Sequence, residues 1–394
     1  MPGIAGLRGT DDWGTDERPK NFREMILWRN PNGSAPLTAF MARMKSESVN
    51  DPEFSWWEEE LNPIRVQTPT GGAANLGSTA FDLVAGGLDL VPGDILMVEK
   101  TETALYDNEL VEVSSVTDDT NIVVKRAAAG TTVAVTGASA DLTKIGNVYE
   151  EGSNSPNTAT RNPTKKTNFC QIFKTAYQIS ETAKLTHART GDALKNDKKR
   201  KMFDHSVAME LAWMFGVSNE DTSGTEPKRF SGGLREFITT NVKIYATTPT
   251  EDDFLDQTYK VFDYDAGSAG NERIILAGNG FLNSLNKLAR TSSSTRINFD
   301  GTLKTYGMNL QRWVLPQGTL YVRTHPLMNV HAKFTNSAFI VDPSAIIYRY
   351  MRDTKHQDNI QANDADVQKG QWLTEAGLEI RHEKTMGYLG NFVV

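Results

Sequence analysis

Apolar and polar residues alternate along Phe169–Ile179, which predicts a β-strand with one aromatic face. Phe169, Phe173 and Tyr177 fall on that face, so another element has to cover it. A serine, a glutamate and a threonine follow directly. The stretch Asn168–Thr182 therefore predicts a long strand that runs into the start of a helix.

A second pattern, with apolar residues every three or four positions, predicts a long helix over Ala193–Phe215. Asp192 suits its N-cap, and Gly216 suits the position after its end. The run Lys195–Lys201 makes the first half polar, so we expect a solvated first half and a buried second half. The expected apolar stripe consists of Phe203, Val207, Leu211 and Met214.

Beyond this helix, helical and strand-like patterns alternate, which predicts an α+β fold. Helices are expected over Thr250–Tyr264 and Gly280–Leu288. The strand candidates are Arg273–Ala277, Leu303–Leu315, Thr319–Val322, Ala338–Val341, Ile346–Tyr350, Leu373–Glu383 and Tyr388–Val394.

The N-terminal part of the chain differs in character. Residues 1–50 are polar and predict an arm that needs another body to lie on. In Glu53–Leu61, Trp56 and Trp57 are adjacent, and adjacent residues of a strand point to opposite faces. We therefore expect one ring in the core and the other half-exposed. Alternatively, the strand is contacted on both sides or one ring lies on a surface that another chain covers, since tryptophan is enriched at interfaces.

Residues 88–148 form a block of short strand-like runs with turn signals between them. Pro92-Gly93 suits a type II turn, in which glycine supplies the positive φ. Such runs predict a small sandwich or barrel, inserted here into a long loop. The runs are Ile95–Val98, Leu110–Val116, Asn121–Arg126 and Thr131–Val135.

The composition narrows the possible architectures and compartments of the protein. The 394 residues suggest two or three domains at about 150 residues each. An apolar fraction of 39% and a mean hydropathy of −0.44 favour thin domains with polar arms over one deep core. A net charge of −7 disfavours a surface that grips nucleic acid. One cysteine, no signal-peptide pattern and no bilayer-spanning run predict a soluble protein of a reducing, intracellular compartment.

Three patterns approach known chemistry and fall short. Gly278–Asn283 follows a predicted strand but lacks the third glycine of a dinucleotide-binding turn. His382 begins a zinc-protease pattern, yet Met386 stands where the second histidine belongs. Asn363–Gly370 resembles a calcium loop in composition only. Cys170 lies in a predicted strand, where a thiol packs as a small apolar group. We therefore assign no catalytic, cofactor-binding or metal-binding residue and expect no enzyme.

The order of these features carries a family resemblance. The chain passes from the arm through the tryptophan strand and the inserted β block to the Asn168–Thr182 strand and the long helix. Further matching segments are Leu90-Val-Pro-Gly-Asp94, Arg126…Gly130-Thr-Thr132, Glu150-Glu-Gly-Ser153, Val341-Asp-Pro-Ser344, Tyr348-Arg349 and Met351-Arg352. Over nearly its whole length the chain resembles major capsid proteins of tailed double-stranded-DNA bacteriophages, in a subgroup with an inserted domain in the extended loop.

The resemblance implies the Hong Kong 97 phage capsid fold. It implies an N-terminal arm (1–50) and an extended loop (51–180) that carries an inserted β domain at about 88–148. A peripheral domain (181–245) would follow, with a spine helix at about 193–215. The chain would end with an axial domain (246–345) and strands that return to the peripheral domain (346–394).

The implied function is self-assembly into the icosahedral or prolate head shell of a phage, which encloses double-stranded DNA without sequence-specific binding. The shell would be assembled in the host bacterial cytoplasm from hexamers and pentamers, with portal, scaffold and decoration proteins as possible partners and no membrane or cofactor. Alternatives are an encapsulin-like compartment and a β-rich surface or carbohydrate-binding protein. The candidate subunit-interface residues are Trp56, Trp57, Phe169, Phe173 and Tyr177.

Overall fold

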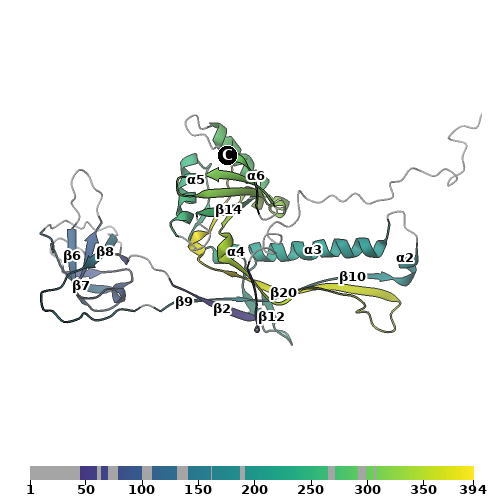
Figure 1. The fold of residues 1–394 in the computed structure, drawn as a ribbon, viewed down its shortest axis with the longest axis horizontal. Coiled ribbons are helices and arrows are strands. Elements are labelled where there is room, and N and C mark those ends of the chain that lie inside the picture. Colours follow the sequence, from purple (N-terminus) through teal and green to yellow (C-terminus); the bar gives the residue numbers. More distant parts are fainter. Residues whose placement is uncertain are drawn as a thin grey trace, which may run out of the picture. The chain divides into compact units, whose positions relative to one another are not determined.

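The computed structural model describes residues 45–59, 64–69, 79–99, 109–130, 141–160, 162–186, 191–264, 271–291, 299–305 and 308–394. The chain forms two compact units (Figure 1). One is Trp57–Lys165, and the other joins the chain up to Trp56 with Lys166–Val394. Strands β2 (Glu53–Glu58) and β9 (Thr164–Phe169) pair where the chain leaves and re-enters the larger unit. Most of the predicted arm, 1–44, lies outside the described residues.

The smaller unit is a six-stranded antiparallel sheet in the order β3-β8-β5-β6-β7-β4. One side of its alternating strands forms an aliphatic core around Phe81. The predicted runs at β5, β6 and β7 are confirmed, and Gly93 has the positive φ, 95°, that its turn requires. The sheet also includes β3 and β4, which precede residue 88, whereas Thr131–Val135 lies outside the described residues. The elements are β3 (Arg65–Gln67), β4 (Ala80–Asp82), η1 (Gly87–Asp89), β5 (Asp94–Val98), β6 (Glu109–Val116), β7 (Asn121–Lys125) and β8 (Asp141–Asn147).

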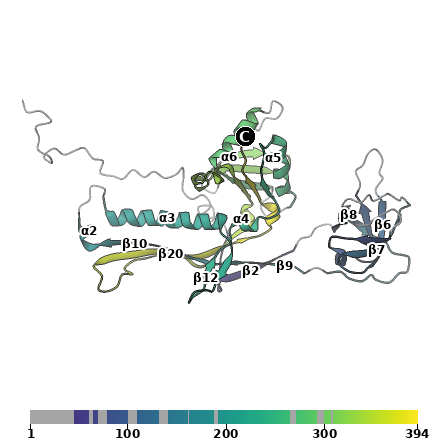
Figure 2. The same cartoon turned by 180° about the vertical axis from the view of Figure 1, so that it is seen from behind.

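In the larger unit, a four-stranded sheet in the order β1-β19-β20-β10 carries the long helix. Helix α3 (Ala193–Phe215) runs along β10 and β20 in both views (Figures 1 and 2). The predicted strand is present but is interrupted at Cys170, and β10 runs into α2 as predicted. The other elements are β1 (Ser46–Ser48), β10 (Gln171–Ser180), α2 (Glu181–Leu185), β19 (Ile346–Gln357) and β20 (Val367–Ile380).

Helix α3 has the predicted bounds, and the Asp192 carboxylate caps it by accepting from the backbone N–H of Lys195. Of the predicted apolar stripe, only Met214 is buried, so that prediction was wrong. The buried side chains are His205, Met209, Glu210, Trp213 and Met214. Two of them are polar and have polar partners in distant segments, which an apolar pattern cannot reveal.

Gly216 ends α3 for a different reason than predicted. Its φ is −62°, so it does not adopt the left-handed conformation expected after a helix. A Cβ at this position would clash with the carbonyl oxygens of Ala212 and Ser231. Glycine is therefore required by close backbone packing, not by its dihedral angle.

A second, seven-stranded sheet in the order β13-β21-β18-β14-β17-β16-β15 completes the α+β fold. Helices α5 (Glu251–Thr258) and α6 (Asn279–Thr291) cover one of its faces. Its other face packs against the end of α3 and α4 (Leu234–Phe237). The segment Leu303–Leu315, expected as one strand, lies across the hairpin of β15 and β16, so that prediction was wrong. The strands are β13 (Val242–Ile244), β14 (Glu272–Ala277), β15 (Phe299–Thr305), β16 (Met308–Val314), β17 (Thr319–Thr324), β18 (Ala338–Val341) and β21 (Gly387–Gly390).

Short elements connect these layers. They are the hairpin β11 (Asn219–Asp221) and β12 (Lys228–Phe230), and the 3-10 turns η2 (Tyr259–Phe262), η3 (Pro326–Val330), η4 (Phe334–Asn336), η5 (Pro343–Ala345) and η6 (Glu383–Thr385).

Candidate functional site

Asn168, at the end of β9, joins three segments through one buried amide. Its NH₂ group donates to the carbonyl oxygens of Leu378 at 2.7 Å and Gly232 at 3.1 Å. Its Oδ1 accepts from the backbone N–H groups of Gly232 at 2.7 Å and Phe169 at 2.8 Å. The amide uses both donors and both acceptor positions, so it fixes β9 relative to β20 and to the loop before α4. The pattern of apolar residues did not predict that the Asn168 side chain is buried.

The two adjacent tryptophans lie on opposite sides of β2. Trp56 is 6% exposed and packs against the rings of Phe54 and Phe237, with centroids 6.2 and 5.7 Å away. Trp57 is 64% exposed. The prediction of one core ring and one partly exposed ring is confirmed, and Trp57 is the exposed one of the pair.

The aromatic face of β10 is covered by its own chain. Phe173 is buried and meets the rings of His205 and Trp213 edge-on, at centroid distances of 6.4 and 6.2 Å. Tyr177 is buried as well, and Phe169 is half-buried. The rings of Phe173 and Tyr177 are therefore covered within the chain and are not available to another molecule.

A polar tie holds the end of the β19–β20 hairpin against β10. The Tyr177 hydroxyl donates to Asp358 Oδ1 at 2.6 Å and lies 2.8 Å from His356 Nε2, and the two rings stack. The hydrogen bond from Tyr177 lowers the pKa of Asp358, and burial raises the pKa of the Tyr177 hydroxyl. The phenol thus keeps its proton and the carboxylate its charge. Lys198 of α3 approaches the same carboxylate at 3.6 Å.

Two buried histidines tie α3 to its surroundings. His205 lies between two hydroxyls, with Nδ1 3.0 Å from Thr175 Oγ1 and Nε2 2.8 Å from Thr374 Oγ1. Burial lowers the pKa of His205, so its imidazole is held neutral. Farther along α3, Glu210 Oε1 lies 2.7 Å from Nε2 of His325, and both side chains are fully buried. These contacts fix the helix in register on the sheet and against the start of η3.

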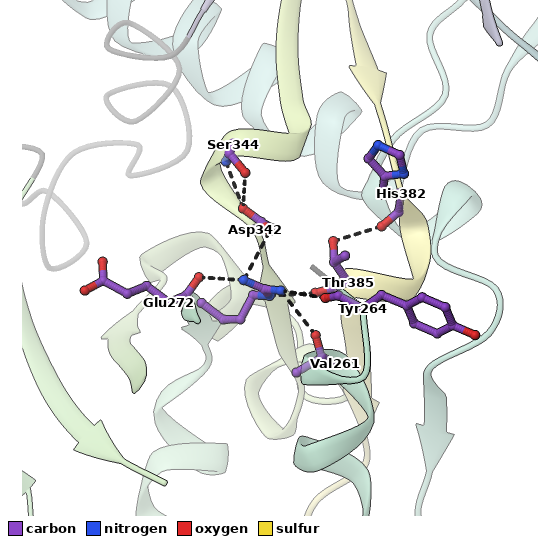
Figure 3. A network of polar contacts seen from close by, with 8 residues as sticks. Val261, Tyr264, Glu272, Asp342, Ser344, His382 and Thr385 are labelled. Carbon is purple, nitrogen blue, oxygen red and sulfur yellow. Dashed lines mark hydrogen bonds and ion pairs between the residues drawn. The ribbon is translucent and has the colours of Figure 1, made fainter. Parts of the chain in front are cut away.

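The seven-stranded sheet encloses an arginine. The Arg273 guanidinium lies 3.2 Å from Asp342 Oδ2 and is fully buried. Asp342 Oδ1 accepts from the hydroxyl and backbone N–H of Ser344 at 2.7 and 2.9 Å. Figure 3 shows this network, in which Arg273 also donates to the backbone carbonyls of Val261, Tyr264, Glu272 and Thr385. The N–H groups of the guanidinium are occupied by backbone carbonyls and one carboxylate, so none of them is open to a substrate.

The face of the four-stranded sheet that points away from α3 carries ion pairs at the end of the sheet where β10 begins. Arg349 and Arg381 both bind the buried carboxylate of Glu379. Farther along, Arg352 Nε contacts Glu375 Oε2 at 2.5 Å. Each of these three arginines therefore has a carboxylate partner on this part of the face.

The Gly278–Asn283 segment and Cys170 have structural roles. At the start of α6, the backbone N–H of Asn279 donates to Asn329 Oδ1 at 2.6 Å and that of Gly280 to Thr335 Oγ1 at 3.2 Å. The donors that a phosphate would need are therefore in use. Burial raises the pKa of the Cys170 thiol to about 12, which removes its nucleophilic form near neutral pH.

Within the described residues, no three His, Cys, Asp or Glu side chains gather in a way that could hold a metal ion. None of the helices in the described ranges has the length and apolarity that crossing a bilayer requires.

Comparison with known proteins places the whole chain in one group. The family model for the SU10 major capsid protein matches residues 8–392. The major capsid protein of Pseudomonas phage PaMx41 is 26% identical over 359 residues, which cover 89% of this chain and 83% of that protein. The capsid of a native GTA particle aligns over 99% of this chain and 100% of its own at 10% identity and a TM-score of 0.49. A structure from Mycobacterium phage Adephagia aligns over 98% of both chains at 9% identity and a TM-score of 0.48.

Proposed function

Because the chain belongs to the SU10 major capsid protein family, we propose that it builds the head shell of a tailed phage in the arrangement of the Hong Kong 97 capsid fold. The protein is a structural component of the phage head shell, not an enzyme, and its place is the virion capsid. The family match over residues 8–392 carries this conclusion. The buried polar ties support it, because they hold the framework together and present no reactive group.

The finer assignment follows the order of elements. Residues 1–50 would be the arm, and 51–180 the extended loop, which carries the six-stranded sheet of the smaller unit as its inserted β domain. Residues 181–245 would be the peripheral domain with α3 as its spine helix, and 246–345 the axial domain. Residues 346–394 would return to the peripheral domain. The pairing of β20 with β10, and of β19 with β20, supports this return, because it brings the last part of the chain back beside α3.

The interior of such a shell encloses double-stranded DNA. A chain with a net charge of −7 can enclose DNA without binding it tightly, because tight binding depends on neutralising phosphates with lysine and arginine. Hexamers and pentamers of this chain would form the shell in the host cytoplasm, with portal, scaffold and decoration proteins as further partners. Trp57 and the surfaces around Trp56, Phe169, Phe173 and Tyr177 would contribute to subunit contacts.

Electron microscopy of the expressed chain tests the proposal, alone and together with its phage's other head proteins. We expect closed shells with five-fold and six-fold clusters of subunits. Native particles should contain nuclease-resistant DNA. Particles that hold an enzyme in place of DNA would indicate an encapsulin-like compartment. A chain that stays monomeric under every assembly condition while its smaller unit binds a glycan would indicate a surface-binding protein.

A further inference from the structure

We propose that the four-stranded sheet, in its part toward the connection between β19 and β20, binds an acidic surface on a second copy of this chain. The binding surface consists of Lys174 in β10, Lys369 in β20 and Lys355 in β19, and we call it the distal lysine face. The inference rests on the proposed shell assembly and names one of the contacts through which it would occur.

Strand pairing places the three lysines on one side of the sheet. Lys174 pairs with Leu373, and Leu373 pairs with Lys355, so these residues form one row across three strands. Lys369 pairs with Gln178, which points to the same side as Lys174 because side chains alternate along β10. Two strand spacings separate the Cα atoms of Lys174 and Lys355, roughly 10 Å.

This side of the sheet is open in the larger unit. Along β10, Ile172, Lys174, Ala176 and Gln178 are exposed, whereas the residues between them face α3 and are buried or half-buried. On β19, Lys355 is exposed too, and Lys369 on β20 is half-buried. Because backbone hydrogen bonds hold β20 on both sides, the face is a rigid platform and not a set of free loops.

Within the described part of the chain, the ion pairs on this side of the sheet lie nearer the start of β10. Toward the start of β10, a glutamate on the same side of the sheet contacts each of Arg349, Arg352 and Arg381. Among the described residues, no carboxylate forms an ion pair with any of the three lysines of the distal lysine face. Three positive charges on one face repel one another at low salt, although no two of these lysines are directly opposite each other. A surface with carboxylates that covers this face would relieve the repulsion and supply the missing partners.

A second copy fits this requirement better than nucleic acid does. The chain has a net charge of −7 even with these lysines included, so the rest of the chain carries more carboxylates than lysines and arginines. In rings and closed shells, a face of one subunit meets a different face of the next, so a basic face can meet an acidic one. The lysines are interspersed with glutamines and the exposed Ile172, and nucleic-acid binding generally uses a larger continuous basic field.

Zero-length cross-linking of mixed particles tests the contact directly. Shells are assembled from equal amounts of ordinary and ¹⁵N-labelled chain and treated with a carbodiimide, which joins lysines only to carboxylates in contact with them. We expect peptides that join Lys174, Lys355 or Lys369 to an aspartate or glutamate of the other isotopic form. Links confined to single chains, or no links at these lysines, would overturn the inference.

A charge-removing variant gives an independent measurement. The triple substitution Lys174→Gln, Lys355→Gln and Lys369→Gln should lower particle yield several-fold at low salt and flatten the fall in yield as salt rises. The matched control replaces Lys228, Lys243 and Lys333, which are exposed elsewhere in the larger unit, with glutamine. An unchanged urea midpoint shows that the variant folds. Equal yields for the variant and the control would contradict the inference.

The outcomes separate the two proposals. Normal particles without links between copies refute this contact and leave shell assembly standing. Absence of particles from the wild-type chain under every condition refutes shell assembly and, with no link between copies, this contact as well. Cross-linking of the three lysines to DNA in filled particles, without links to a second copy, would assign the face to nucleic acid and overturn the inference.

Discussion

Replacement of Asn168 should weaken the larger unit by an amount that hydrogen-bond accounting can estimate. In Asn168→Ala, the buried N–H of Gly232 loses its acceptor, which costs about 1–3 kcal/mol. The bonds to Phe169, Leu378 and the Gly232 carbonyl each contribute about 0.5–1.5 kcal/mol. The sum is roughly 2.5–7.5 kcal/mol, a large part of the ~5–15 kcal/mol by which a domain is usually stable.

Asn168→Asp separates hydrogen bonding from packing. Aspartate has nearly the same volume, but it places an oxygen against the carbonyl of Leu378 at the 2.7 Å where an N–H now donates. We therefore expect a loss at least as large as in Asn168→Ala, although no cavity is created. If packing alone mattered, Asn168→Asp would be nearly neutral.

Equilibrium urea unfolding of the unassembled chain measures both effects through tryptophan fluorescence, since Trp56 and Trp213 are buried in the larger unit. Asn219→Ala is the control, because Asn219 is exposed in β11 and should change stability by less than about 0.5 kcal/mol. A loss below about 1 kcal/mol in Asn168→Asp would refute the assignment of this amide as a structural tie.

Three further predictions follow from the buried polar groups. Because burial lowers the pKa of His205, the folded chain binds fewer protons than the unfolded chain, so this contribution to stability is complete above the ordinary pKa of 6.5 and is lost as the pH falls below it. The urea midpoint of the wild type should fall more between about pH 7.5 and about pH 5.5 than that of His205→Gln, and equal falls would refute this. Arg273→Met should cost about 3–5 kcal/mol by leaving the Asp342 charge buried, and adding Asp342→Leu should restore soluble yield; a double variant as insoluble as the single one would count against the pair. Cys170 should react with a thiol reagent only after unfolding, and rapid labelling of the folded chain would contradict its burial and raised pKa.

Much of the fold could be predicted where local chemistry determines it. The bounds of α3 follow from the capping carboxylate of Asp192 and the lack of helix breakers before Gly216. Strand β18 matches its predicted bounds because all four of its residues are apolar and buried. The hairpin of β15 and β16 was missed because a reversal needs only two residues, while strand-like composition continues on both sides of it.

The candidate site was harder to predict because its contacts are remote in sequence. The alternation in β10 shows that Phe173 and Tyr177 need cover, but not which element supplies it. The structure supplies it from α3 and β19, within the same chain. Asn168, His205 and Glu210 left no signal, because a polar residue is compatible with a buried position only once its partners are known.

These buried polar groups suit a protein that has to repeat one shape in every copy. Apolar contacts are non-directional, so a chain with only 39% apolar residues and thin layers could shift its helix along the sheet at small cost. Hydrogen bonds are directional, and a displaced His205 or Glu210 would be left buried without a partner, which costs more than a shifted apolar contact. The ties therefore set the register of α3 and β20 before any neighbour arrives. Each copy would then present the distal lysine face in the same geometry, as repeated contacts in a closed shell require.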